Sequence, residues 1–256
     1  MNKLIPMAGA GSRFVNEGYT MPKPLLPIMN LPMVVQASNA LPKADKDIFI
    51  LRDFHISDYK IDESLKQYFP NAELIVLDEL TEGQAVTCLK AKELINNNEE
   101  LVIGASDNGM IYNADKFTAA KQQADAIVFT FKNNIAVNAN PKAYGWVVAD
   151  NDNWITQIKV KFDMPNPMQN HAIVGAFWFK KGSDFVEAAE HMIAENRRIN
   201  NEFYVDECIN DLLVMGKKVM AFEVEHYICW GTPVDYQTFN YWEDFFKQLP
   251  EHPYGK

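Results

Sequence analysis

The sequence contains little cysteine and no long hydrophobic run. Its three cysteines, Cys88, Cys208 and Cys229, are far apart among 256 residues. An odd number of widely spaced cysteines does not suit a disulfide framework, so we expect reduced thiols and a cytoplasmic protein. No apolar run reaches the length of a transmembrane helix, and the residues before Gly9 do not resemble a signal peptide. We therefore expect no membrane partner.

Positive charge is also scarce. The chain has 24 Lys and Arg against 34 Asp and Glu, a formal net charge of −10. A nucleic-acid-binding surface needs a basic patch, so we expect no nucleic-acid partner. A single small nucleotide remains compatible with this charge, because its phosphates respond to cations close to them. With 48% hydrophobic residues and no repeat or linker, the chain should fold as one domain over residues 1–256. We expect a nucleotide-binding half over residues 1–135 and an acceptor-binding half over 136–256.

Apolar strands alternate with helical segments in the first half of the chain. The pattern predicts strands at Leu4–Met7, Asp47–Leu51, Glu73–Leu77, Leu101–Gly104 and Ala126–Phe131, and helices at Pro32–Leu41, Ile56–Phe69 and Ala85–Ile95. Such alternation is typical of an α/β domain with a mixed, mostly parallel sheet and helices on both faces. Ligands of these sheets bind at the carboxyl ends of the strands.

The second half has a different pattern. It predicts strands at Tyr144–Ala149, Trp154–Lys161, Ala172–Phe179 and Val219–Val224, and helices at Phe185–Ala194, Tyr204–Met215 and Pro233–Leu249. Gly216 is expected to cap the second of these helices. The last helix is rich in aromatic residues, which we interpret as core or as a contact in a homo-oligomer: Phe239, Tyr241, Trp242, Phe245 and Phe246.

The chemistry of the chain begins in a glycine-rich loop after the first strand. Gly9 and Gly11 allow a sharp turn whose amide groups can approach a ligand, and such turns attract anions. Arg13 and Lys23 would add full positive charge, so a polyphosphate is the expected ligand. An ordinary surface turn is the alternative. The loop is not a P-loop, and Phe14 stands where a dinucleotide fingerprint has its third glycine.

Two adjoining motifs in this region resemble one protein family. The pattern Gly-x-Gly-x-Arg-Phe at Gly9–Phe14, followed by Pro-Lys-Pro-Leu at Pro22–Leu25, is similar to the signature of the sugar-phosphate nucleotidylyltransferases. The resemblance implies a GT-A-like, Rossmann-type fold. It also implies that Arg13 and Lys23 contact the phosphates of a nucleoside triphosphate. The residues that would wrap this nucleotide are Ala8, Gly9, Ala10, Gly11 and Ser12.

Two later segments extend the predicted nucleotide site. Gly83 and Gln84 precede a helix, and the Gln84 amide can read the edge of a nucleobase; an ordinary helix start is the alternative. Ser106 and Asp107 follow a buried strand, where a carboxylate suits a magnesium ion that shares its shell with phosphate. A turn aspartate is the alternative interpretation. The resemblance implies that Gly83, Gln84 and Ser106 bind the nucleotide and that Asp107 holds Mg²⁺.

The acceptor site is implied by the same resemblance. Gly145, Lys161, Gly175 and Glu202 match segments that bind the phosphorylated acceptor, with Lys161 on its phosphate and Glu202 on a hydroxyl group. The second strand of the family's acceptor hairpin usually ends Glu-Lys. Here Val160 replaces the acid, which leaves one contact to a sugar hydroxyl without its usual hydrogen-bond acceptor.

A second departure affects the metal. Many members of the family have an aspartate two residues before the late Gly-Thr-Pro turn, and this chain has Cys229 there. A thiol is a poor ligand for magnesium, which prefers oxygen. Either Asp107 suffices, or Asp206 or another acid substitutes. His226 and Cys229 lack two further ligands at zinc spacing.

These features predict a nucleotidylyltransferase that joins a nucleoside triphosphate to a sugar 1-phosphate or a similar small phosphorylated acceptor and releases pyrophosphate. The catalytic residues would be Arg13, Lys23 and Asp107. A nucleotide-binding regulatory protein without activity and a glycosyltransferase of related fold are the alternatives. Asp150 and Asp152 have the form of a glycosyltransferase metal motif, but we expect them in a hairpin turn.

Overall fold

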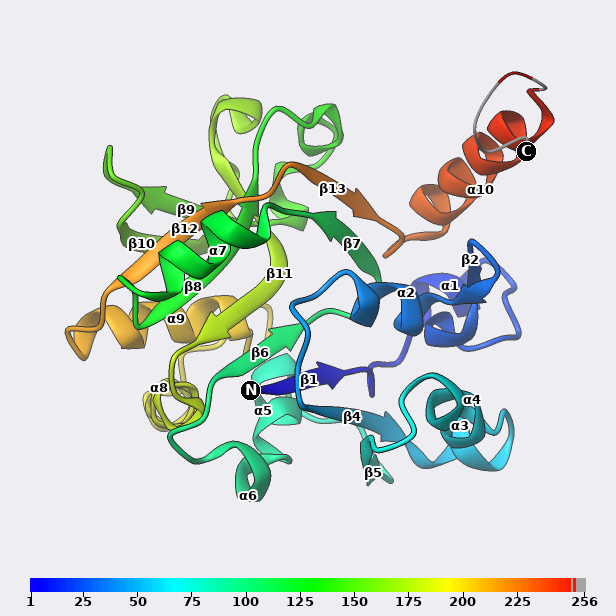
Figure 1. Cartoon of the computed structure of the whole chain (residues 1–256), viewed down its shortest axis with the longest axis horizontal. Helices are drawn as coiled ribbons and strands as arrows, with labels where there is room; N and C mark the ends of the chain where they lie inside the picture. Colours follow the sequence, from blue (N-terminus) through cyan, green and yellow to red (C-terminus); the bar gives the residue numbers. More distant parts are fainter. Residues whose placement is uncertain (250, 252–256) are drawn as a thin grey trace.

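Parallel strands form one half of the central sheet. The structure is a computed structural model, and it describes residues 1–249 and 251. Four strands lie in the order β5, β4, β1, β6, and each neighbouring pair is parallel (Figure 1). Their bounds are Asn2–Pro6 for β1, Lys46–Arg52 for β4, Glu73–Leu77 for β5 and Leu101–Gly104 for β6. The carboxyl ends of these strands therefore share one edge, as predicted.

Strand β11 (His171–Phe179) joins this half to the rest of the sheet. It runs antiparallel to β6, to β8 (Ala126–Phe131) and to β9 (Gly145–Ala149). β9 pairs with β10 (Ile155–Val160) in a hairpin, and β12 (Val219–Glu223) is parallel to β8. The predicted fold class is confirmed: one mixed α/β domain with a mostly parallel sheet at its centre. In the nine-stranded sheet of the described residues, the antiparallel strand pairs are those of β11 with its three partners and the β9–β10 hairpin.

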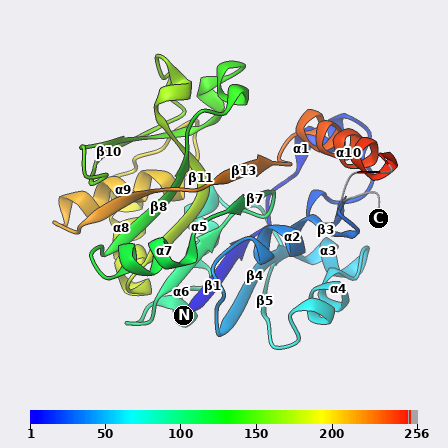
Figure 2. The ribbon, with the colours of Figure 1, turned by 45° about the horizontal axis from the view of Figure 1, so that its top comes forward.

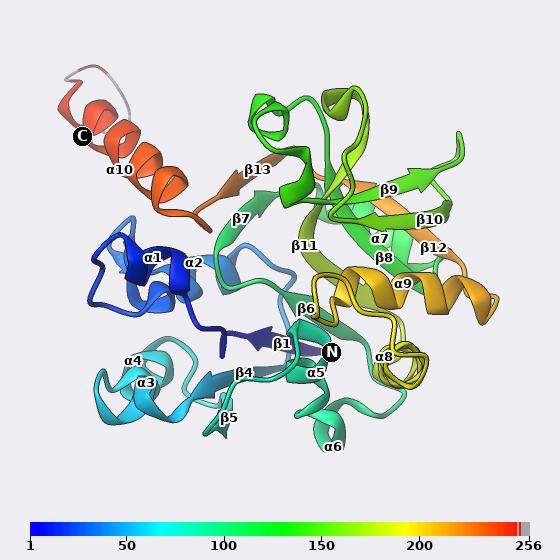
Figure 3. The same cartoon turned by 180° about the vertical axis from the view of Figure 1, so that it is seen from behind.

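Helices cover both faces of the sheet. The helices include α2 (Met33–Asn39), α4 (Ile61–Tyr68), α5 (Gln84–Leu89), α6 (Lys92–Ile95), α7 (Ala114–Lys121), α8 (Gly182–Ala194), α9 (Val205–Val214) and α10 (Pro233–Gln248). α5, α6, α8 and α9 lie on the face seen from behind in Figure 3. α2 and α7 lie on the opposite face, which Figure 2 shows tilted forward.

Alternating strand residues bury their side chains on these two faces. Leu4 and Ile50 belong to the core under α5, α8 and α9, whereas their neighbours Ile5 and Phe49 belong to the core under α2 and α7. This alternation is the period-2 geometry of a strand that is buried on both faces. The continuous apolar runs in the sequence therefore encode strands with helices on either side.

A third, smaller core connects the glycine loop to α10. Phe14 is 2% exposed and makes edge contacts with the rings of Tyr19 and Tyr236. Trp230 and Met33 belong to the same cluster. Figure 2 shows the short helix α1 (Ser12–Asn16) beside α10. The phenylalanine that excluded a dinucleotide fingerprint thus anchors the loop.

Two helices predicted as continuous are each broken in two. The segment Ile56–Phe69 contains the end of α3 (Asp53–Ser57) and all of α4, because Lys60 adopts a left-handed backbone with φ of 51°. The segment Ala85–Ile95 divides into α5 and α6 at Ala91, where hydrogen bonds join residues three apart. Amphipathic spacing continues across both breaks, so periodicity alone gave no sign of them.

Other elements differ from the sequence predictions in simpler ways. The turn between β9 and β10 is as expected, because Oδ1 of Asp150 accepts hydrogen bonds from the N–H groups of Asp152 and Trp154. Gly216 has a φ of 76° just beyond α9, which confirms the predicted cap. The sequence analysis missed α1, α7 and the two-stranded sheet of β7 (Asn108–Ile111) and β13 (His226–Cys229). The short elements are η1 (Lys23–Leu25), β2 (Pro27–Ile28), β3 (Leu31–Pro32), η2 (Ile135–Asn138), η3 (Pro141–Ala143) and η4 (Pro167–Gln169).

The aromatic residues of α10 are mostly not core residues. Tyr241 is 65% exposed, Trp242 49% and Phe245 44%, so their prediction as core is wrong. Phe239 packs against the third core. The aromatic stripe follows the helical period, but Figure 1 shows α10 projecting from the body of the domain. Among the residues that the structure describes, no helix has the length and apolar character needed to cross a membrane.

The central position of β11 leads to a stability prediction. Phe177 is fully buried between β6 and β8. Phe177→Ala should lower the free energy of unfolding by about 3–5 kcal/mol, through lost burial and the cavity left behind. Urea denaturation measures this change. Val214→Ala, at a position that is 81% exposed, is the control and should have little effect. Equal effects of the two substitutions would contradict the assigned core.

Candidate active site

The glycine loop presents its backbone at the end of β1. Gly11 has a φ of 61°, a left-handed conformation that favours glycine, and α1 begins at the next residue. Because Phe14 is anchored in the third core, its neighbour Arg13 is left exposed. Ser12 is also exposed, at the first position of α1. The loop therefore has a rigid attachment and an accessible cation.

An ion pair connects this loop to the end of β6. Nζ of Lys23 lies 2.7 Å from Oδ2 of Asp107, and both side chains are about four-fifths buried, at 19% and 22% exposed. Burial tends to raise the pKa of Asp107, but the positive charges of Lys23 and Arg13 outweigh it and lower that pKa. The structure thus brings the three predicted catalytic residues together. Their catalytic roles stay predictions.

The segment after β13 encloses the Asp107 carboxylate. The backbone N–H of Trp230 donates to the carbonyl oxygen of Asp107 over 2.8 Å. A Cβ at Gly231 would lie 2.8 Å from Oδ2 of Asp107 and 3.3 Å from Sγ of Cys229. The late Gly-Thr-Pro turn therefore needs its glycine because the carboxylate and the thiol both pack against it. Cys229 stands beside Asp107, where the family pattern has its second acid.

The Cys229 thiol is a neutral group in this position. Burial, together with the nearby Asp107 and Asp235 carboxylates, raises the pKa of Cys229 to about 12. The N–H of Gly231 donates to Sγ over 3.3 Å. Within residues 1–249 and 251, no group of three or more His, Cys, Asp and Glu side chains forms a potential metal site. Asp107 is thus the carboxylate that the structure offers at this strand end.

Two hollows lie on either side of the glycine loop. Asp107 lines the first one together with Met7, Gly9, Ala10, Gly11, Lys23, His55, Tyr59, Gln84 and Ser106. The second hollow is lined by Ala8, Gly9, Ala10, Thr81, Gly83, Gln84, Thr87 and Glu202. Gln84 borders both hollows. The structure therefore gathers the predicted nucleotide-binding residues Ala8, Gly9, Ala10, Gly11, Gln84 and Ser106 around the loop.

The sequence analysis missed one wall of the first hollow. The hydroxyl group of Tyr59 donates to the carbonyl oxygen of Thr20 over 2.7 Å and so ties α3 and α4 to the glycine loop. His55 is 2% exposed, and burial with the nearby Arg52 charge lowers its pKa to about 4, so it is neutral near pH 7. These residues come from the broken helix, and no motif in the sequence distinguishes them.

Gly83 also permits a close approach between two backbone segments. Its φ is 127°, and a Cβ there would lie 2.5 Å from the backbone nitrogen of Phe203. The backbone N–H of Phe203 donates to the carbonyl oxygen of Glu82, and the N–H of Ala85 donates to the carbonyl oxygen of Phe203. The close approach that glycine permits is therefore to the chain's own backbone. This crossing holds Glu202 beside Gln84, on the wall of the second hollow.

A second charged cluster surrounds Lys161. Its backbone has a φ of 54°, and Nζ donates to the carbonyl oxygen of Ala143 over 2.7 Å. The same nitrogen lies 5.6 Å from the centre of the Tyr204 ring. Burial and the charge of Arg13 lower the pKa of Lys161, while Asp206 and Glu202 act in the opposite direction. Lys161 thus shares its surroundings with Arg13, so the predicted acceptor and nucleotide sites are neighbours.

The other predicted acceptor residues lie around this cluster. Burial, with a hydrogen bond that the Tyr204 hydroxyl donates to Glu202, raises the pKa of Tyr204, which places Glu202 beside that tyrosine. A Cβ at Gly145 would overlap Oδ2 of Asp206. Gly175 has a φ of 92° at the bend of β11, and the carbonyl oxygen of Gly175 accepts from the N–H of Ala105. Gly175 therefore supports the segment that carries Asp107.

An aromatic pocket lies beyond Cys229. It is lined by Asn134, Tyr144, Tyr227, Cys229, Asp235, Phe239, Trp242 and Phe246, among others. The Tyr227 ring is stacked on Phe131 with centroids 4.0 Å apart. Phe239, Trp242 and Phe246 of α10 thus line a pocket that also includes the thiol.

A profile of the nucleotidyl transferase family matches residues 3–245 of this sequence. The chain belongs to the nucleotidyl transferase family. The resemblance of its glycine loop to that of the sugar-phosphate nucleotidylyltransferases is thereby confirmed. The family match extends across both halves of the sheet.

Two curated relatives are larger proteins. The chain is 26% identical over 233 residues to a bifunctional sugar-1-phosphate nucleotidylyltransferase/acetyltransferase of Sulfurisphaera tokodaii, covering 89% of this chain and 51% of that protein. It is 28% identical over 184 residues to the bifunctional protein GlmU of Methanococcus aeolicus, covering 70% of this chain and 40% of that protein. The nucleotidyl transferase chain thus spans about half the length of these relatives.

Solved structures share the fold at lower identity. The nucleoside-diphosphate-sugar pyrophosphorylase of Vibrio cholerae RC9 superposes with a TM-score of 0.76 at 19% identity, over 93% of this chain and 98% of that one. The inositol-1-phosphate CTP transferase of T. maritima superposes with a TM-score of 0.72 at 12% identity, over 97% and 96%. These likenesses establish the fold of this nucleotidyl transferase family member.

The Lys23–Asp107 pair leads to a prediction about ionisation. In the folded protein Lys23 lowers the pKa of Asp107 against the effect of burial, so Lys23→Met should raise that pKa. A carboxyl-detected NMR titration measures it. A lowered folded-state pKa stabilises the fold above the unfolded-state pKa, and this contribution is lost as the pH falls through the folded-state value. Arg13→Met is the matched control, with a smaller expected rise because its effect on Asp107 is weaker. An unchanged Asp107 pKa in Lys23→Met would contradict the ion pair.

Proposed function

We propose that the protein is a nucleotidylyltransferase that couples a nucleoside triphosphate to a small phosphorylated acceptor. The observation that supports this most strongly is the convergence of Lys23, Arg13 and Asp107 at the strand ends beside the glycine loop. Lys161 lies close enough for Arg13 to lower its pKa, so two phosphate-binding regions would adjoin. The family match and the name of the Sulfurisphaera tokodaii relative support the same reaction class.

In the proposed reaction an oxygen of the acceptor phosphate attacks the α-phosphorus of the nucleotide. The new P–O bond forms as the bond to the oxygen of the β-phosphate breaks, and pyrophosphate leaves with both bonding electrons. Lys23 would neutralise charge on the α-phosphate and the attacking oxygen, and Arg13 would stabilise the leaving pyrophosphate. Lys161 would orient the acceptor. Positioning and charge neutralisation account for catalysis of this kind, without a covalent intermediate.

The residues at the end of β6 fit one magnesium ion. The lowered pKa of Asp107 keeps its carboxylate ionised, and Gly231 places no side chain against Oδ2. The Cys229 thiol is neutral and soft, so it would not add a ligand. We therefore propose that Asp107 holds Mg²⁺ alone, with phosphate oxygens and water completing the shell. When bound, the ion would add positive charge beside the phosphates.

The identities of the base and the acceptor are separate questions. Gln84 lines both hollows, and in the proposed reaction its side-chain amide would read a base edge. A sugar 1-phosphate is the proposed default acceptor, as in the name of the Sulfurisphaera tokodaii relative. Cys229 in place of a second acid favours one other candidate, a nucleotide sensor without catalysis. Such a sensor would bind a triphosphate with Mg²⁺ and release no pyrophosphate.

The first test of this function is turnover by the Lys23→Ala variant. Pyrophosphate release is measured with each nucleoside triphosphate, Mg²⁺ and a panel of sugar 1-phosphates. Lys23→Ala should lower kcat by about 10²- to 10³-fold, the scale for loss of one preorganised electrostatic contact. Lys116→Ala, at an exposed lysine of α7, should retain wild-type turnover. Normal turnover by Lys23→Ala would remove this lysine from the mechanism, and release of sugar from a nucleotide sugar would favour a glycosyltransferase.

The second test concerns the metal. Chelation of Mg²⁺ should abolish pyrophosphate release, and re-addition should restore it. Asp107→Asn should raise the Mg²⁺ concentration for half-maximal activity, because an amide oxygen carries no net charge. Asp235→Asn is the matched control, since Asp235 is held by the hydroxyl group of Thr232 at the start of α10. Full activity in chelator would contradict the proposed magnesium requirement.

A further inference from the structure

The missing acid at Val160 has a structural counterpart on α9. Val160 and Gly145 are directly paired in the β9–β10 hairpin, and paired residues of antiparallel strands face the same side of a sheet. The Val160 side chain packs against the core that contains α9. On that same side, a Cβ at Gly145 would overlap the Asp206 carboxylate. An acid therefore stands on the face where a glutamate at position 160 would stand, but it comes from a different element.

The Asp206 carboxylate is open to an additional hydrogen-bond donor. It lies in the first turn of α9, and its own backbone N–H donates to it. No other residue of the described chain donates a hydrogen bond to this side chain. Burial raises the pKa of Asp206 to about 6, while the neighbouring Lys161 partly offsets that rise. A half-buried carboxylate that accepts one hydrogen bond from its own backbone is stabilised by a ligand that donates a second hydrogen bond to it.

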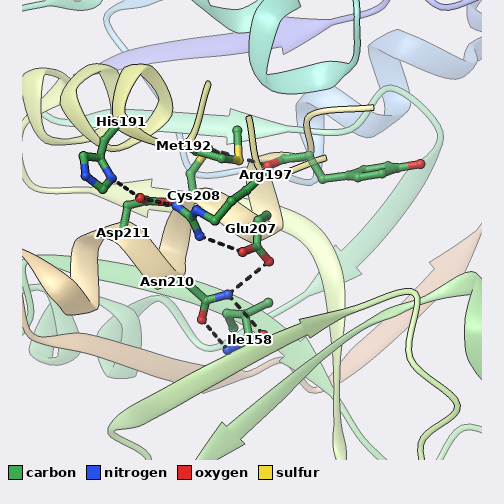
Figure 4. A network of polar contacts seen from close by, with 9 residues as sticks. Ile158, His191, Met192, Arg197, Glu207, Cys208, Asn210 and Asp211 are labelled. Carbon is green, nitrogen blue, oxygen red and sulfur yellow. Dashed lines mark hydrogen bonds and ion pairs between the residues drawn. The ribbon is translucent and has the colours of Figure 1, made fainter. Parts of the chain in front are cut away.

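Helix α9, whose first turn carries Asp206, is tied to β10 by the polar network shown in Figure 4. Asn210, one turn further along α9, accepts from the N–H of Ile158 over 2.9 Å and donates to its carbonyl oxygen over 3.1 Å. Asn210 also donates to Glu207, which Arg197 binds over 2.8 Å. Both hydrogen-bonding groups of a β10 residue are thus held by α9. This clamp keeps the start of α9 above Gly145.

We propose that Asp206 is the residue that binds a hydroxyl group of the phosphorylated acceptor. This inference rests on the function proposed above. Because Lys161 would take the acceptor phosphate and lies beside Asp206, the hydroxyl is one close to the phosphate-bearing carbon. The preferred acceptor is therefore a polyol phosphate, such as a sugar 1-phosphate with an intact neighbouring hydroxyl. Gly145 is required because any side chain there would displace the carboxylate.

The experiment uses the sugar 1-phosphate that the wild-type protein turns over fastest. Asp206→Asn keeps the size of the side chain but removes its charge, so it should raise the acceptor KM about 10- to 100-fold, as for loss of a charged hydrogen bond. The KM for the triphosphate should stay unchanged. Asp115→Asn is the matched control. Asp115 is the second residue of α7, just as Asp206 is the second residue of α9, but the Asp115 side chain is exposed.

A deoxy acceptor separates ligand binding from a structural role. The 2-deoxy analogue should have a higher KM than the parent sugar with the wild-type protein, but the same KM as the parent with Asp206→Asn. Non-additivity of this kind indicates a direct contact. Val160→Glu in an Asp206→Thr background should also recover acceptor binding, because it returns an acid to the same face from β10.

Three results would overturn the assignment. The first is an unchanged acceptor KM in Asp206→Asn. The second is an equal penalty for the deoxy analogue with both proteins, and the third is a rise in KM that follows a loss of thermal stability alone. If the wild-type protein releases no pyrophosphate with any acceptor, the proposed function itself fails. That outcome is distinct from one in which the wild-type protein is active and substitution of Asp206 leaves the acceptor KM unchanged.

Discussion

The ion pair between Lys23 and Asp107 is the contact on which the candidate site depends. It joins residues 84 positions apart, one in the loop after β1 and the other after β6. Neither side chain is fully exposed, so each would lose stabilisation without its partner. The pair holds a cation and an anion at the strand ends, which is where α/β sheets bind ligands. In the proposed reaction a phosphate would replace the carboxylate as the partner of Lys23.

Missing Cβ atoms shape the walls of this site. Gly231 allows the late turn to pack against Asp107 and Cys229, and Gly83 allows the chain to cross the backbone of Phe203. Gly145 makes room for Asp206. In each case the space left by the glycine is taken by a polar group of the protein itself. These glycines therefore bring separate segments together, whereas Gly11, with its left-handed backbone, turns the chain at the end of β1.

The two departures from the family pattern have different consequences. Cys229 keeps the position of the second acid beside Asp107 but contributes a neutral thiol, so this position carries no charge where the family pattern has an acid. The Val160 side chain packs against the core, and Asp206 of α9 lies on the same face of the hairpin. One substitution therefore removes a charge from the site. The other is accompanied by a carboxylate from a neighbouring element.

The sequence by itself determined the fold class, the positions of the strands in the nine-stranded sheet and the glycine loop that follows the first strand. These depend on local features: apolar runs, glycine spacing, and cations close to one another along the chain. It could not place the breaks at Lys60 and Ala91, because helical periodicity continues through them. Only the tertiary structure decided that Lys23 meets Asp107, that Gly83 meets Phe203 and that Asp206 meets Gly145. Those contacts join residues far apart in the chain, and they arise from how strands and helices pack, which local pattern does not specify.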